Sequence, residues 1–131
     1  MNSTAAQLRE NGTDIVRLFA RFALGASFLS AVADRLVMSL FPSSSMGLFA
    51  WAATIAETLF GILLIAGFKI RIASILSGLL LLSFAIGMAT GLGIKTPFDY
   101  SVFSAAAAAF LLAFWEPDRF TLDKLLNRLR N

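Results

Sequence analysis

The sequence contains 131 residues, of which 58% are hydrophobic and only 15% are charged. Soluble domains carry about 25% charged residues, so this chain has too few polar side chains to cover a surface in water. Cysteine and histidine are absent, which excludes disulfides, thiol chemistry, iron–sulfur clusters, histidine-ligated haem and the commonest zinc ligands. The net charge of +3 comes from basic residues that flank apolar segments, which favours anionic lipid over nucleic acid as the partner. We therefore predict an integral membrane protein that holds no metal or covalently bound cofactor.

The first apolar segment covers residues 15–40 and should end at Phe41-Pro42 and the serine run 43–45, where proline and consecutive serines favour a turn. It is too long for the apolar core of a signal peptide, so we expect it to remain attached. The second segment, 46–68, contains a single ionisable residue, Glu57, and ends before the charged hinge 69–71. Because about 20 apolar residues form a helix long enough to cross a bilayer, both segments are predicted transmembrane helices.

The third segment, 70–93, places Gly87 and Gly91 at GxxxG spacing, a pattern that allows close helix contact but also occurs by chance in glycine-rich membrane helices. The fourth, 98–115, follows Pro97 and contains the alanine run 105–109, whose small side chains also favour close packing. The sequence thus predicts a single domain over 1–131, an all-α integral membrane four-helix bundle.

Residues 118–130 form a short amphipathic segment, predicted to be a C-terminal helix capped by Asp118 or Thr121. Its leucines share one stripe: Leu122, Leu125, Leu126 and Leu129. The favoured interpretation is an interfacial helix resting on lipid headgroups, and the alternative is a docking helix for a cytoplasmic partner.

Most basic residues fall on one side of a four-span arrangement. Only Arg35 and Lys95 lie toward the other side. By the positive-inside rule the N-terminus, the second loop and the C-terminus are cytoplasmic, and the protein is a multi-pass protein of the inner (cell) membrane, with Trp115 and Phe120 at the inner interface. The basic residues on the cytoplasmic side are Arg9, Arg17, Lys69, Arg71, Arg119, Lys124, Arg128 and Arg130.

Glu57 lies near the middle of the second segment, where an unpaired carboxylate costs about 2.5 to 3.5 kcal/mol. Arg21 and Arg35 on the first segment are candidate partners, because 14 helical residues bring them to nearly the same face about 21 Å apart. We predict a polar centre of Glu57 and Arg35, with Asp34 and Arg21 at its periphery. This centre either binds an anionic or carbonyl-bearing group or fixes helix packing as an ion pair.

The stretches RFALGASFLSAVADRL (21–36) and AETLFGILLIAGFKIRIAS (56–74) resemble the DoxX family of small four-span membrane proteins. Its first-helix pattern is R-x-x-x-G-x-x-F-x-x-x-G-x-x-K-L, and its second is E-x-x-x-G-x-x-L-x-x-G-x-x-x-R. Val32 replaces the second glycine of the first pattern and Arg35 replaces its lysine. The matching residues are Arg21, Gly25, Phe28, Leu36, Glu57, Gly61, Leu64, Gly67 and Arg71.

The resemblance implies a membrane subunit that contacts quinone or anchors a redox complex, with a soluble or membrane redox partner. The sequence shows no catalytic nucleophile, phosphate-binding loop or metal-ligand cluster that would indicate a self-contained enzyme. Two alternatives remain open: a noncatalytic scaffold or assembly factor, and a small transporter that would need to form a homo-oligomer.

Overall fold

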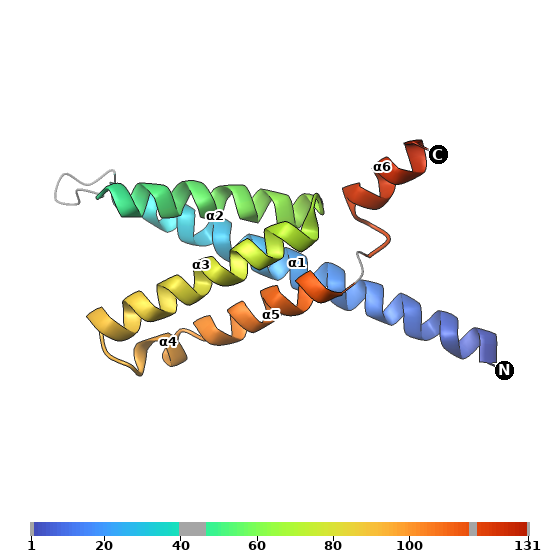
Figure 1. Ribbon diagram of the computed structural model, residues 1–131, viewed down its shortest axis with the longest axis horizontal. Helices are drawn as coiled ribbons and strands as arrows, with labels where there is room; N and C mark the ends of the chain where they lie inside the picture. The colour runs from blue at the N-terminus through green and yellow to red at the C-terminus, as the bar shows by residue number, and fades with distance from the viewer. Residues whose placement is uncertain (1, 40–46, 116–117, 131) are drawn as a thin grey trace.

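A computed structural model describes residues 2–39, 47–115 and 118–130, and within these ranges the chain is helical with no strand (Figure 1). The all-α prediction is confirmed. The predicted turn at 41–45, the predicted helix ends at Leu40 and Met46, and Glu116-Pro117 lie outside the described residues. In chain order the helices are α1 (Asn2–Ser39), α2 (Leu48–Ala66), α3 (Ile70–Gly91), α4 (Thr96–Asp99), α5 (Val102–Phe114) and α6 (Leu122–Arg130).

Helix α1 begins at Asn2, well before the predicted start at Ile15. No proline interrupts the polar N-terminal residues, and several of them are good helix formers, so the helix of the apolar segment continues through them. At 1.5 Å per residue its 38 residues measure about 57 Å, almost twice the thickness of a bilayer core. The N-terminal part of α1 accordingly projects past the other long helices (Figure 1).

The predicted hinge between the second and third segments is present. Gly67 ends α2 in the left-handed conformation (φ 73°), and its N–H donates to the carbonyl of Leu63 at 2.9 Å. Lys69 is also left-handed (φ 47°), after which α3 begins at Ile70 as predicted. Two left-handed residues in close succession reverse the chain, so α2 and α3 form a tight helical hairpin.

The predicted fourth segment, 98–115, is not one helix. Pro97 occupies the first turn of the short helix α4, and Ser101 adopts a left-handed conformation (φ 54°) that separates α4 from α5. Helix α5 therefore begins at Val102 and its 13 residues measure only about 20 Å.

Two helices are long and apolar enough to cross a membrane: α1 over Thr4–Val37 and α3 over Ile70–Gly91. The apolar parts of α2 (Ala50–Ala66) and α5 (Val102–Phe114) are shorter. Length and composition thus identify two candidate spans among the described helices.

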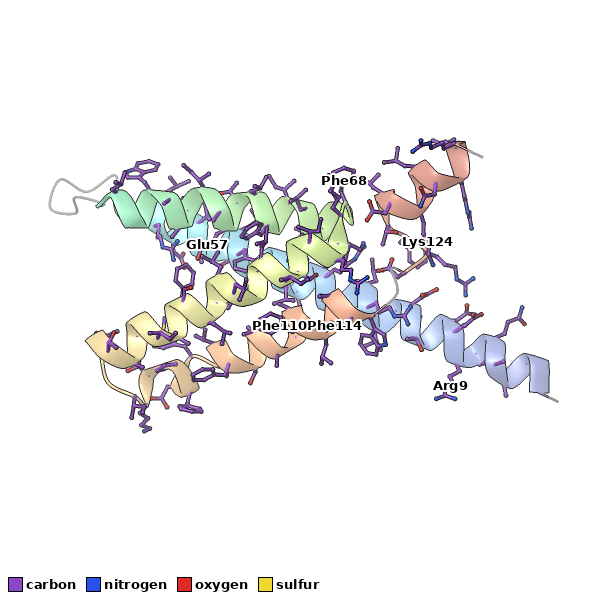
Figure 2. All side chains as sticks on the ribbon, viewed as in Figure 1. Arg9, Glu57, Phe68, Phe110, Phe114 and Lys124 are labelled. Carbon is purple, nitrogen blue, oxygen red and sulfur yellow. The ribbon has the colours of Figure 1, made fainter. Side chains whose placement is uncertain are left out.

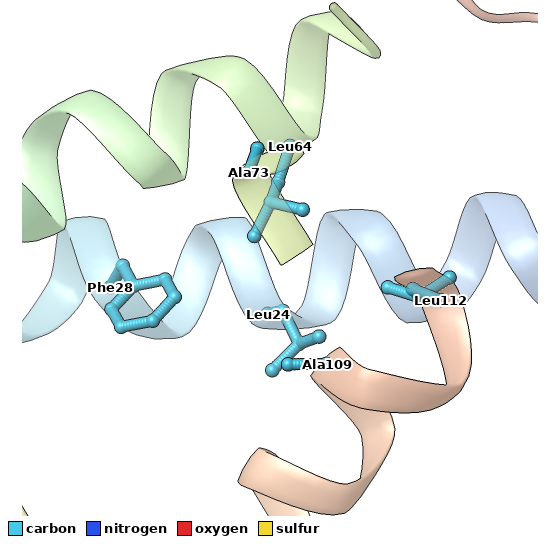
Figure 3. Close-up of a cluster of buried hydrophobic side chains, with 6 residues drawn as sticks. All are labelled: Leu24, Phe28, Leu64, Ala73, Ala109 and Leu112. Carbon is cyan, nitrogen blue, oxygen red and sulfur yellow. The ribbon is translucent and has the colours of Figure 1, made fainter. Parts of the chain in front are cut away.

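Helices α1 and α2 pack as one pair and α3 and α5 as another, with further contacts between the pairs. All four contribute to one buried apolar cluster (Figure 3): Leu24, Phe28, Leu64, Ala73, Ala109 and Leu112. Two of the six are alanines, and Ala20, Ala105 and Ala108 pack against the cluster. Such small side chains allow helix backbones to approach closely.

Helices α1 and α2 lie close together at Gly25 and Gly61, two glycines of the DoxX-like pattern. A Cβ atom added to Gly25 would lie 2.6 Å from Cγ1 of Ile65 and 2.9 Å from the carbonyl oxygen of Gly61. In contrast, no atom lies within 4 Å of a Cβ added to Gly87 or Gly91. The GxxxG pair therefore makes no close helix contact among the described residues.

We expect Gly25→Ala to lower the free energy of unfolding by about 1 to 3 kcal/mol, because the new methyl group overlaps the α2 backbone. The matched control is Gly87→Ala, which introduces the same methyl group into open space within a helix and should be neutral or stabilising. Thermal unfolding of the purified protein in detergent measures both. Equal midpoints for the two variants would contradict the close crossing at Gly25.

The exposed faces of α2 and α3 are mainly apolar, whereas several polar side chains of these helices are buried. The large exposed hydrophobic residues on α2 are Leu48, Trp51, Ile55, Leu59 and Ile62, and those on α3 include Ile72, Leu76, Leu79 and Ile86. The spacing of three and four places each set on one helical stripe. The buried polar residues of the same two helices are Thr54, Glu57, Ser74 and Ser77. This is the reverse of the distribution in a water-soluble helical bundle.

Candidate functional site

Glu57 and Arg35 form a bidentate ion pair between α2 and α1 (Figure 2 shows Glu57 on α2). Glu57 lies on the inward stripe of α2 with Thr54 and Leu64, and its side chain is only 3% exposed. The Nη2 atom of Arg35 donates to Oε1 at 3.1 Å, and Nη1 donates to Oε2. Both carboxylate oxygens of Glu57 are therefore engaged by a geometry that is among the strongest hydrogen-bonded ion pairs.

The guanidinium of Arg35 also contacts α3. Its Cζ atom lies 5.7 Å from the centroid of the Phe84 ring, a cation–π distance. The Arg35 side chain is 32% exposed, in contrast to Glu57. The Glu57 side chain is thus enclosed, and Arg35 is the member of the pair with surface that a ligand can reach.

The other two predicted members of this centre lie elsewhere. Asp34 is exposed on α1 and is not among the partners of Glu57 or Arg35. Arg21 binds Asp118 in a separate ion pair, with Nε 3.2 Å from Oδ2. The structure therefore brings together Glu57 and Arg35 but neither Arg21 nor Asp34.

The Arg21–Asp118 ion pair is the most buried charged contact in the described part of the chain, with both side chains 1% exposed. Oδ1 of Asp118 also accepts a hydrogen bond from the backbone N–H of Phe120 at 2.9 Å, which fixes the turn after α5. From the sequence, Asp118 is predicted only as a candidate helix cap, because the residues around it give no sign of a partner in the first helix.

The segment 118–123, here named the clasp, also binds the α2–α3 hinge. The carboxylate of Asp123 accepts hydrogen bonds from the N–H groups of Lys69 (3.0 Å) and Ile70 (3.4 Å), at the beginning of α3. The N–H of Asp123 donates in turn to the carbonyl of Gly67 at 3.3 Å. A carboxylate at a helix N-terminus satisfies unpaired N–H groups and interacts favourably with the helix dipole. The clasp thus joins the hinge to α1.

The clasp packs tightly against the hinge where Thr121 meets Gly67. The hydroxyl of Thr121 accepts from the N–H of Lys124 at 3.2 Å and donates to the carbonyl of Asp118 at 3.1 Å. Of the two predicted caps, Thr121 is the one that caps α6. A Cβ atom added to Gly67 would overlap Nη1 of Arg21 and lie 2.9 Å from Cα of Thr121, so this position requires glycine for both space and conformation.

A third polar contact joins the clasp to the projecting part of α1. Nε of Arg119 lies 2.8 Å from Oδ2 of Asp14, and Nη2 of Arg119 donates to the side-chain oxygen of Asn11. Arg17 lies 3.5 Å from the other oxygen of Asp14, and its Cζ atom is 5.4 Å from the centroid of the Trp115 ring. Asp14 is therefore shared by two arginines, one from α1 and one from the clasp.

The described side chains include no group of three or more histidine, cysteine, aspartate or glutamate residues that could hold a metal ion. The Glu57–Arg35 ion pair and the contacts of the clasp hold the helices together. The Arg35 guanidinium can in addition donate hydrogen bonds to a carbonyl or an anion. In comparisons with known proteins, no family model, no protein of curated function and no solved structure matches this chain. The DoxX resemblance therefore stays a prediction.

Proposed function

We propose that this protein is a four-span integral membrane protein that anchors or supports a larger membrane complex. The observation that carries the membrane assignment is the reversed side-chain distribution. Lipid-facing positions need no polar groups, whereas a charge inside a bilayer is stabilised when it is paired and enclosed, as Glu57 is. In water, the exposed leucine and isoleucine stripes of α2 and α3 would instead form a large apolar surface open to aggregation.

In the proposed arrangement α2 and the α4–α5 unit complete the four spans. Helix α2 has 19 residues, close to the number needed to cross a bilayer. Helix α5 is too short alone, but Phe98, Tyr100 and Phe103 are exposed around the break at Ser101 and extend its apolar surface. The clasp and the projecting part of α1 lie at the end that carries most of the basic residues, so we place both termini in the cytoplasm.

Topology reporters test the arrangement directly. A cytoplasm-active reporter fused after residue 131 or inserted at the 69–71 hinge should be active, and the same reporter inserted near Lys95 should not. An active reporter at all three positions would show that the α3 and α4–α5 units do not cross the membrane as proposed.

An anchoring or accessory role is supported by the ion pairs and hydrogen bonds that carboxylates make within the fold. Both oxygens of Glu57 bind Arg35, and Asp118 and Asp123 bind α1 and the hinge, so these carboxylates hold the fold together. The DoxX resemblance points to a redox complex as the assembly that is supported. Affinity purification from membranes in mild detergent should recover the chain together with an oxidoreductase subunit. Recovery of the chain alone at every detergent concentration would contradict this role.

A second candidate role, quinone binding, is favoured by Arg35. A guanidinium that is held by Glu57 and Phe84 and remains one-third exposed is suited to donate a hydrogen bond to a quinone carbonyl. Lipid-reconstituted protein should then retain quinone on purification, and Arg35→Gln should lower the bound amount several-fold, because it removes the charged donor. Arg71→Gln, which changes an exposed arginine on α3, is the matched control.

Two outcomes would reject quinone binding: no quinone in the wild-type extract, or equal loss in both variants. If Glu57→Gln impairs folding and partner association together while quinone content per folded molecule is unchanged, the ion pair is structural and the scaffold interpretation holds.

A further inference from the structure

The end of the molecule where α1 projects past the bundle carries two polar pockets that share Asp14 and Arg119 as walls. One, of about 520 Å³, has four cationic lining residues, Arg9, Arg17, Arg119 and Lys124. The other, of about 580 Å³ and here named the headgroup pocket, is lined by Asn11, Asp14, Ile15, Arg119, Phe120 and Arg128. Figure 2 shows Arg9 on α1 and Lys124 on α6 at this end.

Positive charge is in excess around these pockets. Together they are lined by five cationic side chains and by only two acidic ones, Glu10 and Asp14. Asp14 already binds both Arg17 and Arg119. Arg128 makes no ion pair with any residue that the structure describes, nor do Arg9 and Lys124. The charge of this surface therefore favours the binding of an anion.

The headgroup pocket adjoins a shallow apolar groove on the same helical face of α1. This groove, of about 380 Å³, is lined by Ile15, Leu18, Phe19 and Phe22, and Ile15 also lines the headgroup pocket. From Ile15 to Phe22 the groove follows α1 for about 10 Å toward the bundle. A ligand that fills both therefore carries a negative group at one end and a hydrocarbon chain at the other.

We propose that this surface binds one anionic phospholipid, with its phosphate between Arg119 and Arg128 and an acyl chain along Ile15, Leu18, Phe19 and Phe22. The inference rests on the proposed membrane location, in which the direction from polar pocket to apolar groove matches the direction from cytoplasmic headgroups to the bilayer interior. Arg119 is held in place for the phosphate by Asp14 and Asn11. Arg128 extends from α6, so the bound lipid also joins α6 to α1.

The test compares lipids that differ only in headgroup charge. The full-length protein is reconstituted in bilayers with equal amounts of phosphatidylglycerol and phosphatidylcholine of identical acyl chains, and the lipids retained after extraction are counted by native mass spectrometry. One phosphatidylglycerol should be retained in preference to phosphatidylcholine. Arg128→Gln should weaken this preference about fivefold, the factor that corresponds to one basic residue near an anionic lipid surface. Arg130→Gln removes the same charge from the same helix outside both pockets and should leave the preference within twofold.

Three results would overturn the site: equal retention of the two lipids by the wild type, an equal effect of Arg128→Gln and Arg130→Gln, or displacement of phosphatidylglycerol by excess inorganic phosphate. The second would indicate diffuse surface charge, and the third a site for soluble phosphate. Co-flotation with liposomes separates these results from a failure of the proposed function. Protein that floats with both lipids but retains neither selectively lacks only the lipid site, whereas protein that does not float is not a membrane protein.

Discussion

Arg21→Met should lower the free energy of unfolding by about 3 to 5 kcal/mol, the largest effect expected for any single substitution in this protein. The change leaves Asp118 as an unpaired carboxylate that is 1% exposed, and it removes the contact that holds the clasp on α1. Equilibrium unfolding of the purified protein in detergent measures the loss. Arg130→Met, at an exposed position of α6 without an ion pair to any described residue, is the control and should change stability by less than about 0.5 kcal/mol.

The double variant Arg21→Met/Asp118→Leu should be more stable than Arg21→Met alone. Replacement of both partners of a buried pair by apolar residues removes the desolvation cost of both charges, whereas removal of one partner leaves the other charge uncompensated. Limited proteolysis gives a local readout, because the clasp of Arg21→Met should be cleaved faster than that of the wild type. A single variant that unfolds within 1 kcal/mol of the wild type, with a protected clasp, would contradict a stabilising role for this pair.

Glu57→Gln should lower the free energy of unfolding by about 2 to 3 kcal/mol. The neutral amide cannot form the bidentate charged contact, and Arg35 is left beside the apolar ring of Phe84 without its counter-charge. The expected loss is smaller than for Arg21→Met because Arg35 is one-third exposed and can be partly hydrated. A double-mutant cycle with Arg35→Gln isolates the interaction between the two side chains.

The cycle should give a coupling energy of at least about 1 kcal/mol, since the two residues bind each other directly. Asp34→Asn is a suitable comparison, because it removes a carboxylate beside Arg35 in sequence that takes no part in the ion pair. Additive effects of Glu57→Gln and Arg35→Gln would show that the pair contributes little, and equal effects of Asp34→Asn and Glu57→Gln would show that only net charge matters.

Helical structure and its approximate bounds could be read from sequence because they depend on local chemistry. Apolar segments without proline predicted α1, α2 and α3, and the charged residues at 69–71 predicted the hinge that the structure places at Gly67 and Lys69. The two largest differences from the predicted helices also have local causes. Helix formers extended α1 to Asn2, and the left-handed Ser101, a residue type with no strong preference for that conformation, divided the fourth segment.

The choice of partner among charged residues required the tertiary structure. Sequence spacing placed Arg21 and Arg35 on similar faces of one helix, and it gave Glu57 access to either. Packing α1 against α2 at Gly25 and Gly61 fixed the register of the two helices, and this register aligned Glu57 with Arg35. Arg21 was then free to bind Asp118, which the chain brings back only after α5.

Composition by itself determined that this chain is rich in apolar residues, poor in charged ones, and without the cysteine and histidine that most metal and thiol chemistry requires. These properties are sums over residues, so they do not depend on how the chain folds. Only the tertiary structure decided that the C-terminal residues form a clasp on α1 and the hinge, and that Arg119 and Arg128 line a pocket together with residues of α1. Both depend on contacts between opposite ends of the sequence, which no local pattern of residue types encodes.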